Sequence, residues 1–150
     1  MTNSSGRGVF ERILVGYDGS DNAKRALGRA IELTKQSKGE LRIVVVADTM
    51  SYSAYTGGGI YKQYNERTKE NAEALASAAL EEAKTAGLPS VYASHEEGQP
   101  ADMILTMATE FKSNLIVVGR RGMRGLARFL MGSVSTAVIS QAKCDVLVVK

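Results

Sequence analysis

Short, nearly continuous aliphatic runs recur along this chain, and they limit its fold more than any other feature. The run Ile43–Val46, for example, reads Ile-Val-Val-Val. Such runs are typical of strands covered on both faces, as in a parallel sheet, whereas half-exposed strands alternate apolar and polar residues. We predict five strands, at Arg12–Tyr17, Leu41–Ala47, Val91–His95, Asn114–Gly119 and Asp145–Val149. The third is the least apolar and is expected at the periphery of the sheet.

Between the strands, apolar residues recur with the period of an amphipathic helix. Local signals mark several helix ends: Ser20 is a suitable N-cap, Gly39 is a stop signal, and Pro100 suits a first turn. Helices are therefore predicted from Ser20 to Gly39, along Ala72–Ala83, from Pro100 to Phe111 and from Gly132 to Gln141. The start of the second helix is not defined by the pattern.

Strands and helices thus alternate along the chain, which predicts a doubly wound α/β fold. In this fold an open, parallel, five-stranded sheet carries helices on both faces. With 150 residues, 44% of them apolar, the chain has the size of one domain and can fill one core. We expect residues 9–150 to form that domain and residues 1–8 to form a flexible N-terminal tail. Ligands of such folds bind beyond the carboxyl ends of the strands, where the strand order reverses.

Hydropathy and composition exclude several classes of protein. The longest aliphatic run, Ile43–Ala47, is far short of the about 20 apolar residues of a transmembrane helix, so no membrane span is expected. The N-terminal residues lack the apolar stretch of a signal peptide, which predicts a cytoplasmic protein. Cys144 is the single cysteine, so no internal disulfide can form. The net charge of +3 is a weak basic bias and does not argue for a nucleic-acid partner.

The strongest local signal follows the fourth predicted strand. Nine residues separate the segment Gly119-Arg120-Arg121-Gly122 from Gly132-Ser133, which opens a predicted helix. The two glycines of the first segment permit positive φ and close approach of the backbone to an anion. The second segment offers unpaired N–H groups at the positive end of a helix dipole, which favour phosphate. An anion is therefore the expected ligand, and more positive charge comes from Arg124 and Arg128 between the two segments.

The first strand ends in Asp18, directly before a predicted helix, and this carboxylate has two interpretations. In a capped turn, Asp18 and Ser20 would satisfy free N–H groups at the start of the helix and do nothing else. As a ligand-binding group, Asp18 would hold a ligand hydroxyl, or a metal ion against phosphates. The residues themselves leave both interpretations open. Asp48, after the second strand, has the same ambiguity and a weaker case for function.

These motifs resemble the nucleotide-binding branch of the universal stress protein family, whose pattern is Gly-x2-Gly-x9-Gly-Ser/Thr. The two glycine segments fit that pattern without a gap, and Arg12–Ser20 and Cys144–Val149 resemble the family's first and last strands. The resemblance implies a Rossmann-like sheet in the strand order 3-2-1-4-5, with ATP in the crevice between the first and fourth strands. It also implies a homodimer that pairs the last strands.

The resemblance further implies roles for individual residues. Asp18 would contact the ribose, or a Mg²⁺ or Mn²⁺ ion bound to the phosphates, and Val46 and Val118 would border the adenine. The other residues implied in the site are Gly16, Gly119, Arg121, Gly122, Gly132, Ser133, Val134 and Ser135. Gly16 stands where some members have proline. Arg120 replaces a residue that is small and polar in many members, so the phosphate pocket is expected to be more cationic than usual.

We expect an ATP-binding regulatory module of the stress response rather than an efficient enzyme, because no clear base for water accompanies the motif. Nucleotide binding would act by stabilising one conformation. The polar, glycine-containing segment Met50–Tyr64 is expected to be a mobile loop that closes over the nucleotide. His95, the only histidine, is interpreted as a surface residue with acidic neighbours.

Two alternative functions are also considered. A slow ATPase or autophosphorylating protein would use Ser133 or Ser135 as a phosphate acceptor. An RNA-associated protein would stack bases on tyrosines while its arginines contact backbone phosphates. The tyrosines in question are Tyr52, Tyr55, Tyr61 and Tyr64. Tyrosines in a loop more often form a lid or a dimer contact, so nucleic acid is not the favoured partner.

Overall fold

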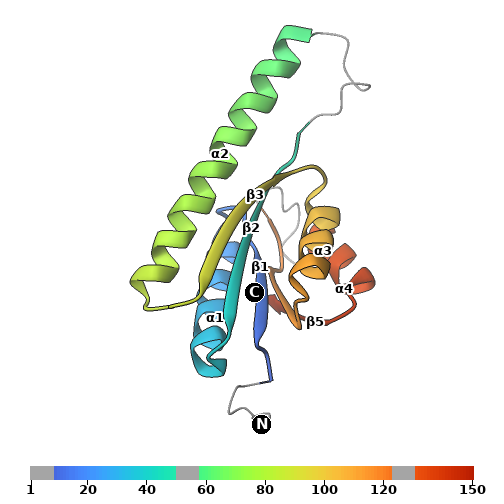
Figure 1. The fold of residues 1–150 in the computed structure, drawn as a ribbon. Helices are drawn as coiled ribbons and strands as arrows, with labels where there is room; N and C mark the ends of the chain where they lie inside the picture. Colours follow the sequence, from blue (N-terminus) through green and yellow to red (C-terminus); the bar gives the residue numbers. More distant parts are fainter. Residues whose placement is uncertain (1–8, 50–57, 123–130) are drawn as a thin grey trace.

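The computed structural model describes residues 9–49, 58–122 and 131–150, and Figure 1 shows the arrangement of their strands and helices. The strands are β1 (Arg12–Gly16), β2 (Glu40–Ala47), β3 (Val91–Glu97), β4 (Leu115–Gly119) and β5 (Asp145–Val149). The helices are α1 (Asp21–Ser37), α2 (Gly58–Thr85), α3 (Pro100–Phe111) and α4 (Ser133–Gln141). Among the described helices, none is long and apolar enough to cross a membrane.

The described strands form one parallel sheet in the order β3-β2-β1-β4-β5, which confirms the predicted fold class and strand order. β1 lies in the middle, and its Val15 pairs with Ile43 of β2 and Val117 of β4. β3 lies at an edge, as its weaker apolar character indicates. β2 and β3 follow β1 on one side of it, and β4 and β5 lie on its other side. The strand order therefore reverses between β1 and β4.

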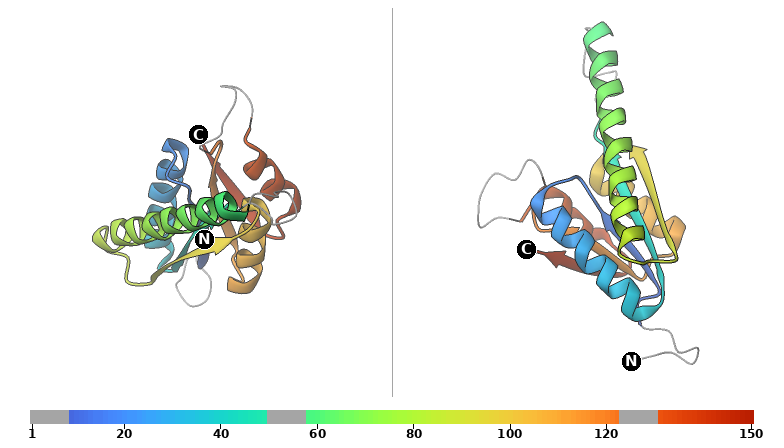
Figure 2. Two further views of the ribbon diagram at one scale, coloured as in Figure 1. Left: turned by 90° about the horizontal axis from the view of Figure 1, so that it is seen from above. Right: turned by 90° about the vertical axis from the view of Figure 1, so that its left-hand side faces the viewer.

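Helices cover both faces of the sheet, as Figures 1 and 2 show. On one face, α1 and α2 pack against a core cluster that includes Ile13 and Val15. On the other face, α3 and α4 contribute to a second cluster around Leu14. The side chains of Ile13, Leu14 and Val15 in β1 are fully buried. Successive side chains of a strand point to opposite faces, so a strand covered on both sides needs an unbroken apolar run.

The part of the expected loop Met50–Tyr64 that the structure describes is helical. Residues 58–64 are the first part of α2, and residues 50–57 lie outside the described residues. Glycines at positions 58 and 59 favour a loop, but each lowers helix stability by only about 1 kcal/mol relative to alanine. A helix that continues to Thr85 can offset that cost. In Figure 1 the first part of α2 extends well beyond the carboxyl ends of the strands.

The connection from α1 to β2 shows a second difference from the sequence prediction. The helix ends as predicted before Gly39, but Lys38, not the glycine, adopts the left-handed conformation, with a φ of 54°. Gly39 is required for a different reason, because a Cβ at this position would collide with the backbone oxygen of Glu11. The glycine therefore allows two backbone segments to approach closely at the amino end of the sheet.

Candidate functional site

A cleft of about 730 Å³ opens at the carboxyl ends of β1, β2 and β4, between the sheet and the first turns of α3 and α4. This volume lies within the range of small-molecule sites. Every residue that the sequence predicted for the site lines this cleft: Gly16, Asp18, Val46, Val118, Gly119, Arg121, Gly122, Gly132, Ser133, Val134 and Ser135. Residues far apart in the sequence thus meet at the point where the strand order reverses.

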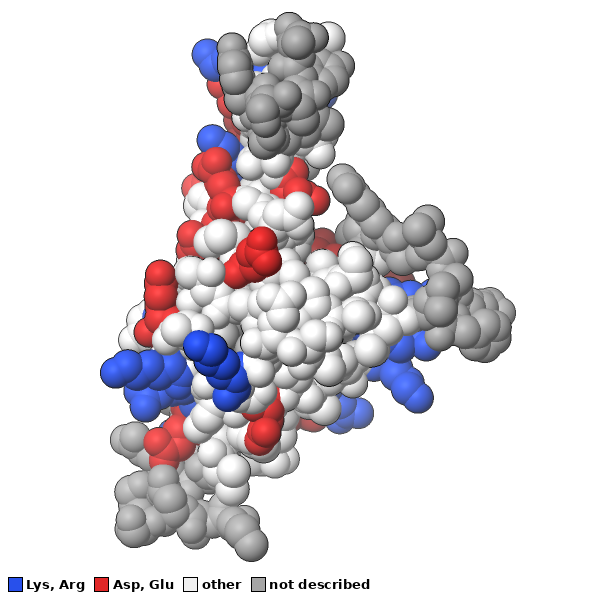
Figure 3. Space-filling model, turned by 90° about the vertical axis from the view of Figure 1, so that its right-hand side faces the viewer, with Lys and Arg blue, Asp and Glu red and all other residues white. Residues whose placement is uncertain are grey.

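One part of the cleft is apolar. Val46 and Val118, near the carboxyl ends of β2 and β4, project toward α3 and pack with the second core cluster. Ile104 of α3 and Ala137 of α4 complete this wall. Figure 3 shows a largely uncharged central area on this side of the molecule, with charged side chains around it. The wall suits a flat, apolar group such as a nucleobase.

Another part of the cleft presents backbone groups. Gly132 is the N-cap residue of α4, and its N–H donates to the backbone oxygen of Arg120 at 2.8 Å. The first N–H groups of a helix have no partner within that helix, and they lie at the positive end of its dipole. α4 therefore directs both donors and partial positive charge at the cleft, which suits an anion.

The glycines of this segment serve close packing. Glycine permits both positive φ and close approach of the backbone, and at Gly119 and Gly122 the structure shows only the close approach, because neither has a positive φ. A Cβ on Gly119 would lie 2.8 Å from Cβ of Asn22, and a Cβ on Gly122 would lie 2.5 Å from Oδ2 of Asp18. A Cβ on Gly132 would lie 3.3 Å from Cα of Arg121. The motif thus allows α1, Asp18 and two backbone segments to approach one another around the cleft.

Asp18 takes part in the capped turn and also lines the cleft. Its Oδ1 accepts a hydrogen bond from the backbone N–H of Ser20 at 2.9 Å. Oγ of Ser20 in turn accepts from the N–H of Ala23 at 3.2 Å, which caps α1. The Asp18 side chain is exposed on the cleft wall. The structure therefore shows the capping contacts, and the position of Asp18 on the cleft wall leaves its role in ligand binding to be tested.

Two serines near the start of α4 differ in their surroundings. Ser133 is exposed, whereas Ser135 is only 2% exposed. Oγ of Ser135 lies 2.9 Å from the backbone oxygen of Arg120 and 3.0 Å from that of Gly132. Because a hydroxyl carries one hydrogen, Ser135 donates to this pair of carbonyls and links α4 to the end of β4. Its hydroxyl is a structural group at the back of the cleft.

Several lining residues were missed or given little weight in the sequence. Asp48 follows β2, and the segment before and within the first turn of α3 adds Gln99, Pro100, Ala101 and Asp102. In a parallel sheet all loops that follow strands meet at the same edge, so the position of the loop after β3 could have indicated them. Met131, directly before the Gly-Ser pair, also lines the cleft.

The described part of the cleft carries charges of both signs. Among the described lining residues, Asp18, Asp48 and Asp102 are acidic and Arg121 is basic. Arg124 and Arg128, which contributed to the expectation of a cationic pocket, lie outside the described residues. No group of three or more His, Cys, Asp or Glu side chains that could hold a metal ion occurs in the described parts of the chain.

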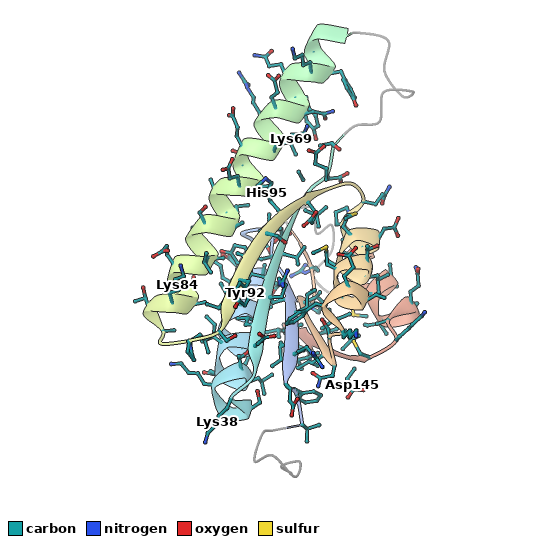
Figure 4. The ribbon with its side chains drawn as sticks, in the orientation of Figure 1. Lys38, Lys69, Lys84, Tyr92, His95 and Asp145 are labelled. Carbon is teal, nitrogen blue, oxygen red and sulfur yellow. The ribbon has the colours of Figure 1, made fainter. Side chains whose placement is uncertain are left out.

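Two other residues considered in the sequence lie away from the cleft. His95 is exposed on β3 and pairs in register with Val45, which belongs to the α1 and α2 face. Figure 4 shows His95 on β3, the strand that contacts α2. Cys144 is half-buried before β5, and burial, together with the neighbouring Asp145, raises the pKa of its thiol. Neither lines the cleft.

A parallel sheet with a ligand-sized cleft at its strand-order reversal defines a doubly wound α/β protein with a binding site at the carboxyl edge. The family model "Universal stress protein family" matches residues 10–150. A Staphylococcus aureus (strain USA300) protein named as a universal stress protein is 37% identical over 144 residues, covering 95% of this chain and 85% of that protein. The chain belongs to the universal stress protein family.

Solved structures agree with this assignment. Universal stress protein UspA from Lactobacillus plantarum has the same fold, with a TM-score of 0.85 and 23% identity over 95% of this chain and 99% of that one. A universal stress protein in complex with cAMP is 31% identical, with a TM-score of 0.73 over 95% of this chain and 99% of that one.

Proposed function

We propose that this protein binds an adenine nucleotide, with ATP as the expected ligand, in the cleft at the carboxyl ends of β1 and β4. The observation that carries the proposal is the division of one 730 Å³ cleft into an apolar wall and a backbone-donor wall. A nucleotide has the same division, with a flat base at one end and phosphates at the other. The cAMP-bound relative supports an adenine nucleotide as the ligand class.

In this proposal each wall holds one part of the nucleotide. Val46 and Val118 border the base, and the Gly119–Gly122 segment and the start of α4 hold the ribose and phosphates. Asp18 is placed to contact the ribose or a phosphate-bound metal ion. When present, Mg²⁺ or Mn²⁺ would offset the repulsion between phosphates and the carboxylates that line the cleft.

Nucleotide binding would serve regulation in the stress response. A ligand shifts a conformational equilibrium by its differential affinity for the two states, so ATP would stabilise the conformation in which the cleft walls lie close together. We favour this role over catalysis, because Ser135, one of the two proposed phosphate acceptors, donates to backbone carbonyls. Tyr61 and Tyr64 belong to a helix, not to a flexible loop, so we do not propose RNA binding. We place the protein in the cytoplasm.

The first test of the proposal is thermal unfolding with a panel of nucleotides. We expect ATP to raise the melting temperature, with a gain of about 2.7 kcal/mol in unfolding free energy at 100 times its dissociation constant. GTP at the same concentration should raise it less, because the cleft would be matched to adenine. The variant Val46→Arg, which places a long charged side chain in the apolar wall, should lose the response.

The matched control is Tyr92→Ala on the exposed surface of β3, which should respond to ATP as the wild type does. An unchanged melting temperature of the wild type in millimolar ATP, ADP and cAMP would contradict the proposal. An equal response of Val46→Arg and the wild type would place the ligand elsewhere.

We also propose that two copies pair through β5. This strand lies at an edge of the described sheet, and the side chains of Val146–Val149 are all partly exposed. An apolar edge strand offers unpaired backbone groups to a second chain. Sedimentation velocity is expected to give twice the 16.1 kDa mass of one chain, and a lysine at the edge, in Leu147→Lys, should favour the monomer. A wild-type mass of one chain would contradict this dimer.

A further inference from the structure

A chain of hydrogen bonds connects the Gly119–Gly122 segment to helix α1 and to the end of β5. Asn22, in the first turn of α1, is half-buried. It does not line the 730 Å³ cleft, but it lines a neighbouring hollow together with Arg25, Arg121 and Gly122. Its Nδ2 donates to the backbone oxygen of Arg121 at 3.3 Å. Its Oδ1 accepts from Nη2 of Arg25 at 2.5 Å. One amide side chain therefore connects helix α1 to the turn that follows β4.

The two partners of Asn22 fix the orientation of its amide. A guanidinium group can only donate and a carbonyl oxygen can only accept, so Oδ1 must face Arg25 and Nδ2 must face Arg121. No other common side chain of this length supplies one acceptor and one donor in this order. Aspartate would place a second acceptor against the carbonyl oxygen, and leucine would offer neither group.

Arg25 is itself held at its other end. Its Nε donates to the backbone oxygen of Lys150, directly after β5, at 2.8 Å. The same end of β5 contacts the turn directly, because the N–H of Arg120 donates to the oxygen of Val149 at 2.7 Å. The turn is thus bound to the edge strand on one side and, through Asn22 and Arg25, to α1 on the other.

The contact between Asn22 and the turn has a consequence for the cleft. In a planar trans peptide the carbonyl and the following N–H point in opposite directions. A carbonyl of Arg121 that is directed at Asn22 therefore directs the N–H of Gly122 away from Asn22. Gly122 lines the cleft, and Gly119 packs so tightly on Asn22 that a Cβ there would come within 2.8 Å. Asn22 thus sets the orientation of a peptide group on the phosphate side.

We propose that Asn22, oriented by Arg25, is a positioning residue that holds the Arg121–Gly122 peptide in the conformation needed to bind phosphate. The proposal rests on the proposed function, because it concerns the phosphate end of the same cleft. It assigns to Asn22 no contact with the nucleotide. Its effect should therefore appear in the phosphate contribution to affinity and not in the binding of the base.

The experiment compares ATP with adenosine in the variant Asn22→Ala by isothermal titration calorimetry. We expect ATP affinity to fall about fivefold to tenfold, the effect of one hydrogen bond, while adenosine affinity changes less than about twofold. The ratio of the two dissociation constants is measured on the same folded sample. A general loss of stability would affect both ligands, so the ratio reports positioning and not folding.

Arg25→Ala supplies a second, independent variant. It should lower ATP affinity by about threefold, and Asn22→Ala/Arg25→Ala should bind ATP as weakly as Asn22→Ala alone, because the two side chains act in series. The matched control is Arg29→Ala, one turn further along α1, where the guanidinium pairs with Glu32 at 3.1 Å on the surface. This control should bind both ligands as the wild type does.

The outcomes separate the two proposals. Wild-type ATP affinity in Asn22→Ala, or an equal loss for ATP and adenosine, would overturn the positioning role and leave the nucleotide site in place. Additive effects of the two substitutions would overturn the role of Arg25 in orienting Asn22. A wild-type protein that binds neither ATP nor adenosine would overturn the proposed function itself.

Discussion

Gly119→Ala is expected to lower the unfolding free energy by about 1–3 kcal/mol and to weaken ATP binding at least tenfold. The added Cβ would lie 2.8 Å from both Cβ and the carbonyl carbon of Asn22, and 3.0 Å from the backbone nitrogen of Ala23. These are mostly backbone atoms at the start of α1, which cannot rotate away. The helix and the end of β4 must separate, and the turn at the phosphate end of the cleft must move with them.

Chemical denaturation and calorimetric titration with ATP measure the two effects of Gly119→Ala. The control is Gly28→Ala, within α1, where an added Cβ meets nothing within 4 Å. In an open helical position alanine is more favourable than glycine by about 0.5–1 kcal/mol, so this variant should gain stability. If Gly119→Ala were as stable as the wild type and bound ATP equally well, the close approach of α1 to β4 would not matter.

Ile104→Ala is expected to lower the unfolding free energy by about 2–5 kcal/mol, the range for removal of a large buried aliphatic side chain. Ile104 is 5% exposed and belongs to the core cluster with Leu14 and Val118. It also forms part of the apolar wall of the cleft. The substitution therefore removes core packing and enlarges the space beside the base, so adenosine affinity should fall together with stability.

Ile139→Ala on α4 is the control for Ile104→Ala. Its side chain is 44% exposed, so its loss should cost about 1 kcal/mol or less. A more specific check uses Gly16, where an added Cβ would lie 2.7 Å from Cδ1 of Ile104. Gly16→Ala should therefore cost less stability in the Ile104→Ala background than in the wild type. Simple additivity would argue against this contact.

Most of the fold was predictable because its signals are local. The unbroken apolar runs indicate strands buried on both faces, as β1 shows with Ile13, Leu14 and Val15. Helical periodicity between the runs then requires crossover connections, which for parallel strands have one hand. The strand order came from resemblance to a family, because periodicity does not specify which strands are neighbours.

The errors occurred where local signals have more than one physical cause. Glycines at positions 58 and 59 indicate a loop by composition, but they are in the first turn of α2. Gly39 was interpreted through backbone conformation, whereas the structure shows that it is needed because the backbone of Glu11 lies against it. A glycine that avoids a steric clash cannot be distinguished in the sequence from one that adopts positive φ.

The order of apolar and polar residues determined by itself that this chain forms a doubly wound α/β sheet with an anion-suited segment after β4. Those properties depend on neighbours along the chain. Only the tertiary structure decided that Asp48, Ile104 and Asp102 share a cleft with that segment, and that Asn22 connects it to Arg25. These contacts join residues up to about one hundred positions apart, and they are set by how α1, α3 and β5 pack around the sheet, which no local pattern encodes.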